Sequence, residues 1–253
     1  LDDLFTEKPE VVAGWTALWS SWITRFDIDG YRVDTAKHVN PEFWNAFIPK
    51  VLATAKSAGK KQFPIYGEVA DSDPRTLSTF VKEQSFNSVL DFGFQSAVSR
   101  FVVTGNGLDG LVNLFNADDM YTSASTSAYS LATFLGNHDM GRIGQFISDS
   151  NSDDAEAAAR AGLANTLLFT LRGAPIVYYG DEKGMTGAGG DQLARQDFFP
   201  TLLPAWQSER RLAGAPIGTA SAFDVTNPLE KQISALSGLR KSEPALAQGG
   251  QQI

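Results

Sequence analysis

The chain has 253 residues, of which 43% are hydrophobic and 20% charged, as in a globular protein with one large domain or two small ones. Its net charge of −8 argues against a nucleic-acid or anionic-membrane partner, and no apolar run approaches membrane-spanning length. The absence of cysteine excludes disulfides, zinc–thiolate sites and cysteine nucleophiles.

The chain starts with Leu1-Asp-Asp-Leu-Phe-Thr, which is neither an initiator methionine nor a signal peptide. We therefore expect the sequence to begin inside a longer gene product. Lack of cysteine fits both a secreted bacterial protein and a cytoplasmic one; we expect secretion, with the cytoplasm as the alternative.

Helices and short strands alternate along the chain. A helix is predicted at residues 9–26, where apolar residues recur at helical spacing after a proline in the first turn. Further predicted helices cover residues 41–58, 74–82, 95–103, 108–115, 154–171 and 228–240. Predicted strands cover residues 28–36, 63–69, 88–92, 131–135 and 174–179, and predicted loops cover 122–130 and 184–190.

This alternation predicts βαβ units and a parallel sheet in an α/β fold. A closed barrel of such units needs eight strands, so a barrel would lack three in this chain. No linker divides the sequence.

The carboxyl ends of the predicted strands carry the candidate site. Three carboxylates and both histidines of the chain lie there: Asp34, Glu68, Asp139, His38 and His138. In a parallel α/β fold, residues from several strands converge at that end.

The first of these segments is Asp29-Gly-Tyr-Arg-Val-Asp34. Strand alternation places Arg32 and Asp34 on one face, where the guanidinium would hold the carboxylate ionised. A carboxylate nucleophile must be an oriented anion. A structural salt bridge at the end of a strand explains the pair equally well.

The second segment, Ile65-Tyr-Gly-Glu68, brings a carboxyl group out of an apolar strand. Desolvation there would favour the protonated form that a general acid needs. The alternative is that Glu68 caps the helix that follows Asp73-Pro74.

The third segment, Leu135-Gly-Asn-His-Asp139, ends an apolar strand in polar side chains. His138 can hydrogen-bond sugar hydroxyls, and Asp139 can orient them or stabilise positive charge. The alternative is an Asn/Asp turn with a histidine satisfied by the backbone.

Together these segments resemble the α-amylase family of glycoside hydrolases. Gly30-Tyr-Arg-Val-Asp-Thr-Ala-Lys-His38 is similar to the family's fourth, nucleophile-bearing strand, and Gly67-Glu68-Val69 to its fifth. Asn137-His138-Asp139 is similar to the seventh-strand motif, and Gly173-Ala-Pro-Ile-Val-Tyr-Tyr-Gly-Asp-Glu182 to the eighth strand. Leu1-Asp-Asp-Leu4 looks like the exit from the family's inserted B domain, which would cover residues 1–8.

The resemblance implies a TIM (β/α)8 barrel. Residues 1–253 would form its C-terminal part, strands four to eight, without the first three strands. The β-sandwich domain that usually follows the barrel would also be absent.

The resemblance also implies a retaining glycosidase that hydrolyses α-1,4-glucans by double displacement. Asp34 would be the nucleophile, Glu68 the acid/base and Asp139 the stabiliser of the transition state, with the first two carboxyl groups about 5 to 5.5 Å apart. The expected substrate-binding residues are Arg32, Lys37, His38 and His138. For Lys37 and His38, a solvated lysine and a packing histidine are nearly equal alternatives.

No organic cofactor is expected. Family members often bind structural calcium through the backbone carbonyl at the His38 position and an aspartate near Asp3, but the other ligands would lie in the missing part. The expected partner is an α-glucan, and the sequence predicts no oligomeric state.

Two alternatives remain open. One is an α-1,6-acting or transglycosylating relative of the pullulanase, cyclodextrin or branching type, although the Lys37-His38 pair favours α-1,4 hydrolysis. The other is a non-catalytic sugar-binding relative, against which the presence of all three carboxylates argues.

Overall fold

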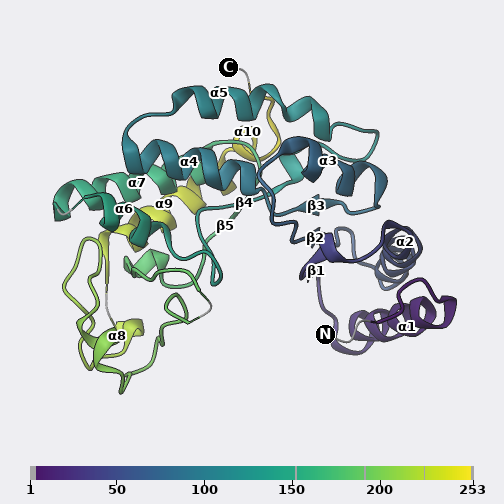
Figure 1. Cartoon of the computed structure of the whole chain (residues 1–253), viewed down its shortest axis with the longest axis horizontal. Coiled ribbons are helices and arrows are strands. Elements are labelled where there is room, and N and C mark those ends of the chain that lie inside the picture. The colour runs from purple at the N-terminus through teal and green to yellow at the C-terminus, as the bar shows by residue number, and fades with distance from the viewer. Residues whose placement is uncertain (1–3, 152, 191, 225, 252–253) are drawn as a thin grey trace. The chain divides into compact units, whose positions relative to one another are not determined.

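The structure, a computed structural model, describes residues 4–151, 153–190, 192–224 and 226–251 (Figure 1). The chain forms two compact units. The first comprises Leu1–Phe92 and Ala117–Ala132, and the second comprises Gly93–Asn116 and Thr133–Ile253. The expected B-domain exit at residues 1–8 falls partly outside the described residues.

The first unit contains a parallel sheet whose strand order is β1-β2-β3. Its strands are β1 (Tyr31–Val33), β2 (Ile65–Gly67) and β3 (Ser88–Val89), and its helices are α1 (Pro9–Phe26), α2 (Pro41–Ser57) and α3 (Pro74–Glu83). Three short 3-10 turns complete it: Ala36–His38, Asp118–Tyr121 and Ala128–Ser130.

Helix α2 shows how the sequence builds this unit. Pro41 occupies the first turn, where its missing N–H costs nothing. The buried residues of the helix recur at helical spacing and join the core of the unit: Phe43, Trp44, Phe47, Ile48, Val51 and Ala55. The helix therefore contributes one apolar face to this core.

The second unit has its own core. Its strands are β4 (Ala132–Phe134) and β5 (Ala174–Ile176), which form a two-stranded sheet. Its α-helices are α4 (Phe92–Thr104), α5 (Leu108–Asn116), α6 (Ile143–Ser150), α7 (Asp154–Thr170), α8 (Pro204–Ser208), α9 (Pro228–Ser242) and α10 (Pro244–Gln248). Two 3-10 turns lie at Asp181–Lys183 and Ala222–Asp224.

The predicted elements are present, with three corrections. The strands are shorter than predicted, because only two or three residues of each pair in a ladder. The strand predicted at 88–92 is wrong at its end, since Phe92 begins α4. Helices α6, α8 and α10 were not predicted, because each spans only five to eight residues, too few for a clear period.

No described helix is long and apolar enough to cross a membrane.

Candidate active site

Asp34 and Glu68 follow neighbouring parallel strands directly. In the β1–β2 register Val33 lies opposite Gly67, so each carboxylate residue is the next one beyond a paired position. The Glu68 N–H donates to the Val33 carbonyl at 2.8 Å, which extends the pairing to this end of the sheet. The predicted convergence of these two residues at one strand edge is therefore confirmed.

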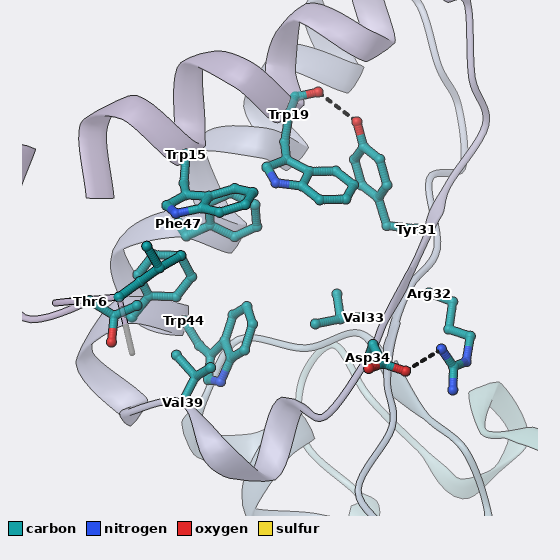
Figure 2. Close-up of a pocket in the computed structure, with 12 residues that line it drawn as sticks. Thr6, Trp15, Trp19, Tyr31, Arg32, Val33, Asp34, Val39, Trp44 and Phe47 are labelled. Carbon is teal, nitrogen blue, oxygen red and sulfur yellow. Dashed lines mark hydrogen bonds and ion pairs between the residues drawn. The ribbon is translucent and has the colours of Figure 1, made fainter. Parts of the chain in front are cut away.

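Arg32 contacts both carboxylates. Its Nη1 donates to Asp34 Oδ1 at 2.8 Å (Figure 2), and its Nη2 lies 3.1 Å from Glu68 Oε2. Burial lowers the pKa of Arg32, but the hydrogen bond to Asp34 and the charge of Glu68 outweigh burial and raise that pKa above its ordinary value. The Arg32–Asp34 pair was predicted; the contact with Glu68 was not.

The two carboxylates differ in exposure. The Asp34 side chain is 66% exposed and that of Glu68 only 11%. The Asp34 carboxylate is therefore accessible to a ligand, whereas the Glu68 carboxylate is largely shielded from solvent.

Thr35 has an unusual backbone conformation beside this pair. Its φ of 47° lies in the left-handed region, which a β-branched residue rarely adopts. Its N–H donates to Glu68 Oε2 at 3.1 Å. Strained backbone conformations of this kind cluster at functional sites, so the Thr35 conformation favours a functional role for this end of the sheet.

Lys37 and His38 form the 3-10 turn after Asp34. Lys37 Nζ lies 3.5 Å from Asp71 Oδ2, so the lysine has a carboxylate partner. A hydrogen bond from the Asp73 N–H lowers the pKa of Asp71, and the charge of Lys37 adds a smaller effect. His38 is exposed.

An aromatic cavity of about 280 Å³ borders Arg32 and Asp34. Figure 2 shows the rings that surround it, which come from α1, β1 and α2: Trp15, Trp19, Tyr31, Trp44 and Phe47. Its lining is mainly apolar apart from Thr6, Arg32 and Asp34.

Asp139 and His138 lie in the second unit, in a tight turn after β4. The turn is closed by reciprocal backbone hydrogen bonds of 3.0 Å between Asn137 and Gly141, and Asn137 Oδ1 accepts from the Asp139 N–H at 2.9 Å. His138 Nε2 lies 3.2 Å from Asp139 Oδ2, and Arg195 Nη2 lies 3.8 Å from Asp139 Oδ1. The Asp139 carboxylate thus has two basic neighbours.

Sequence reasoning missed two arginines near this turn. Arg195 adjoins Asp139, and the fully buried Arg142 forms an ion pair of 2.9 Å with Asp181. Burial raises the pKa of Asp181 to about 6, although Arg142 opposes that effect. The residues that accept hydrogen bonds from the Arg142 side chain lie 37 or more residues away, so no local spacing could reveal these contacts.

The described residues were compared with the calcium site that the resemblance implies. They contain no group of three histidine, aspartate or glutamate side chains that could hold a metal ion, and Asp3 lies outside them.

Comparison with known proteins connects these segments to one family. Residues 1–210 match the family model described as "Alpha amylase, catalytic domain". The chain is 43% identical over 253 residues to an α-amylase of Streptomyces lividans and 30% identical over 185 residues to a cyclomaltodextrinase of Thermoanaerobacter pseudethanolicus. These matches cover 99% and 73% of this chain, but 28% and 29% of the two relatives.

A solved structure shows the same fold. It is a crystal structure of an α-amylase from Geobacillus thermoleovorans complexed with acarbose, which is 28% identical and has a TM-score of 0.76. The similarity covers 97% of this chain and 47% of that one.

Proposed function

Because the chain belongs to the α-amylase catalytic-domain family, whose fold is the TIM barrel, we propose that it carries the catalytic carboxylates of a retaining glycoside hydrolase acting on α-1,4-glucans. Since the chain spans 28% of the length of the Streptomyces lividans relative, this activity is assigned to the complete protein. The acarbose-bound relative supports a glucan-like ligand.

The observation that carries the proposal is the shared contact of Asp34 and Glu68 with Arg32. The guanidinium reaches Asp34 at 2.8 Å and Glu68 at 3.1 Å. A retaining glycosidase needs two carboxyl groups close together, about 5 to 5.5 Å apart, with different roles. One exposed and one buried carboxyl group at the ends of adjacent strands, both in contact with one guanidinium, support this arrangement.

In the first step, Asp34 attacks the anomeric carbon while protonated Glu68 gives its proton to the leaving glycosidic oxygen. The covalent glycosyl–Asp34 ester forms as the glycosidic bond breaks. In the second step, ionised Glu68 takes a proton from a water molecule, which attacks the anomeric carbon and releases Asp34. Arg32 orients both carboxylates throughout.

The remaining roles follow the resemblance of the motifs. Asp139 stabilises the oxocarbenium-like transition state, and His138 binds the same sugar. His38 and Lys37 bind on the leaving-group side. For Lys37, binding competes with its ion pair to Asp71.

We also propose that the five strands are the fourth to eighth of the family barrel. Strand β1 pairs on one edge with β2 and has no strand partner on its other edge among the described residues. The aromatic cavity lies beside β1, and a neighbouring strand could fill it with apolar side chains.

The test is product analysis with the complete protein on starch, pullulan and isomaltose, together with NMR of the first anomer released. Cleavage of starch with release of the α-anomer is expected. Release of the β-anomer would refute the retaining mechanism.

A second candidate is a cyclodextrin-acting or transglycosylating enzyme, which the similarity to a cyclomaltodextrinase favours. Preferential cleavage of cyclodextrins, or new longer oligosaccharides from maltotriose, would identify it.

A further inference from the structure

Arg142 is the largest fully buried side chain of the described residues and has no direct role in the proposed chemistry. Each of its three guanidinium nitrogens donates at least one hydrogen bond. Nε donates to Gln196 Oε1 at 3.0 Å, Nη2 to the Ala194 carbonyl at 3.1 Å, and Nη1 to Asp181 Oδ1 at 2.9 Å and to the Tyr179 carbonyl. A buried arginine is tolerated only when it is paired in this way.

These contacts join three segments of the second unit. Arg142 belongs to the turn that follows β4, and Tyr179 and Asp181 follow β5. Ala194 and Gln196 end the segment of described residues 184–190 and 192–196, which we call the glycine-rich loop. The backbone adds a fifth hydrogen bond, since the Arg142 N–H donates to the Gly187 carbonyl at 3.0 Å. One side chain therefore sets the position of two loops relative to the turn that carries Asp139.

The glycine-rich loop in turn contacts Asp139. The Gly190 N–H donates to the Asp139 carbonyl at 2.9 Å. Arg195, between the two loop residues that Arg142 binds, lies 3.8 Å from the Asp139 carboxylate. Loss of the Arg142 contacts would release the loop end that bears this cation.

The arginine also supports the aromatic residue beside His138. Its guanidinium lies over the Tyr178 ring, 4.5 Å from the ring centroid. The Tyr178 hydroxyl donates to the Ala194 carbonyl at 2.9 Å, and the Tyr178 ring centroid is 6.4 Å from that of His138. Arg142 thus contacts Tyr178, the neighbour of His138. It also binds the residues on either side of Arg195, the neighbour of Asp139.

We propose that Arg142 is a positioning residue for Asp139, acting through the glycine-rich loop and Tyr178. The inference rests on the proposed role of Asp139 and adds to it the side chain that fixes the Asp139 environment. Arg142 contacts no substrate; it keeps Arg195 and His138 in place around the carboxylate.

A double-mutant cycle in the complete protein tests this. Arg142→Lys keeps the charge but cannot reach Gln196, Ala194 and Asp181 together. With an aryl α-maltoside, it is expected to lower kcat about 10- to 100-fold with little change in KM, and by less than about threefold in the Asp139→Asn background. Arg160→Lys is the control, because Arg160 binds the carbonyls of Val102 and Val103 on α4 and should act equally in both backgrounds.

Equal fold losses for Arg142→Lys in both backgrounds would overturn the proposal and indicate a purely structural role. If Arg142→Lys melts below the assay temperature, Gln196→Met is measured in the same cycle and judged by the same criterion. It removes the partner of Arg142 Nε, together with the hydrogen bonds that the Gln196 amide donates to the Thr186 carbonyl and to Glu209. An Asp139→Asn effect below about tenfold would refute the role of Asp139, and this inference with it. A large Asp139→Asn effect with additive losses would refute the inference alone.

Discussion

Arg32 and Glu68 lie 3.1 Å apart across the β1–β2 pair, so the guanidinium that holds Asp34 also holds the carboxyl group on the next strand. This contact turns a local Arg–Asp pair into a three-residue arrangement with fixed geometry. A planar guanidinium can hold two carboxylates in this way, because each of its two terminal nitrogens can donate to one carboxylate.

Arg32→Lys tests the shared contact. An ammonium group can neutralise one carboxylate but cannot hold both in a fixed geometry, so kcat/KM should fall about 10- to 100-fold, the effect of losing one charge-assisted hydrogen bond of about 1.5–3 kcal/mol. Arg75→Lys is the control, since Arg75 forms a similar pair with Asp73 at an exposed position. Equal effects of the two changes would contradict the role of Arg32.

Asp34→Asn tests the nucleophile. The amide cannot form the glycosyl ester, so kcat should fall by at least about 10³-fold while substrate binding, measured by calorimetry, stays nearly unchanged. Asp27→Asn removes a carboxylate of the same unit that is 91% exposed and should have little effect. Activity of the Asp34 variant within about tenfold of wild type would exclude Asp34 as nucleophile.

The arrangement of Arg32, Asp34 and Glu68 could be predicted because it follows from the local sequence pattern of two strands. Arg32 and Asp34 are two residues apart, and strand alternation places them on one face. Glu68 ends the next strand, and parallel pairing brings it to the same edge. The left-handed conformation of Thr35 could not be predicted, because the Glu68 contact that accompanies it comes from a distant segment.

The second half depends on contacts across long sequence separations. The turn at Asn137–Asp139 could be recognised from its polar residues, but Arg142 and Arg195 gain their positions from the fold of the glycine-rich loop. That loop has neither helical nor strand periodicity, so the sequence indicates only that it is a loop. The long helices and the strand centres were predictable, whereas the three short helices and the buried polar network were not.

The buried Arg142–Asp181 pair predicts a pH dependence of stability. Burial raises the pKa of Asp181 from 3.8 to about 6, so the folded protein binds this proton more tightly than the unfolded chain. The protonated Asp181 carboxyl group therefore contributes fully to the free energy of unfolding below about pH 4. This contribution is lost as pH rises to about 6. The loss should amount to about 3 kcal/mol, at 1.36 kcal/mol for each pKa unit.

Urea unfolding of wild type and Asp181→Asn between pH 4.5 and 7.5 measures this term. The stability of wild type relative to the variant should fall as pH rises through this range, because only wild type loses the Asp181 proton. Asp154→Asn, at a carboxylate that is 82% exposed, should differ from wild type by a constant amount. A constant difference for Asp181→Asn as well would contradict the predicted shift.

Gly141 tests how tightly the Asp139 turn packs on the glycine-rich loop. Its φ is 102°, and a Cβ there would lie 2.8 Å from the Gly189 nitrogen and 2.9 Å from the Gly187 oxygen, both backbone atoms that cannot move aside easily. Gly141→Ala should therefore cost about 1–3 kcal/mol of stability and lower kcat more than tenfold, because the turn must shift two residues from Asp139.

Gly238→Ala is the matched control for this substitution. Gly238 lies inside α9 with no atom within 4 Å of an added Cβ, so alanine should stabilise the helix by up to about 1 kcal/mol and leave kcat unchanged. Urea midpoints and kcat are measured for both variants. If Gly141→Ala lowered stability but left kcat as in Gly238→Ala, the contact between turn and loop would be structural only, and the position of Asp139 would not depend on it.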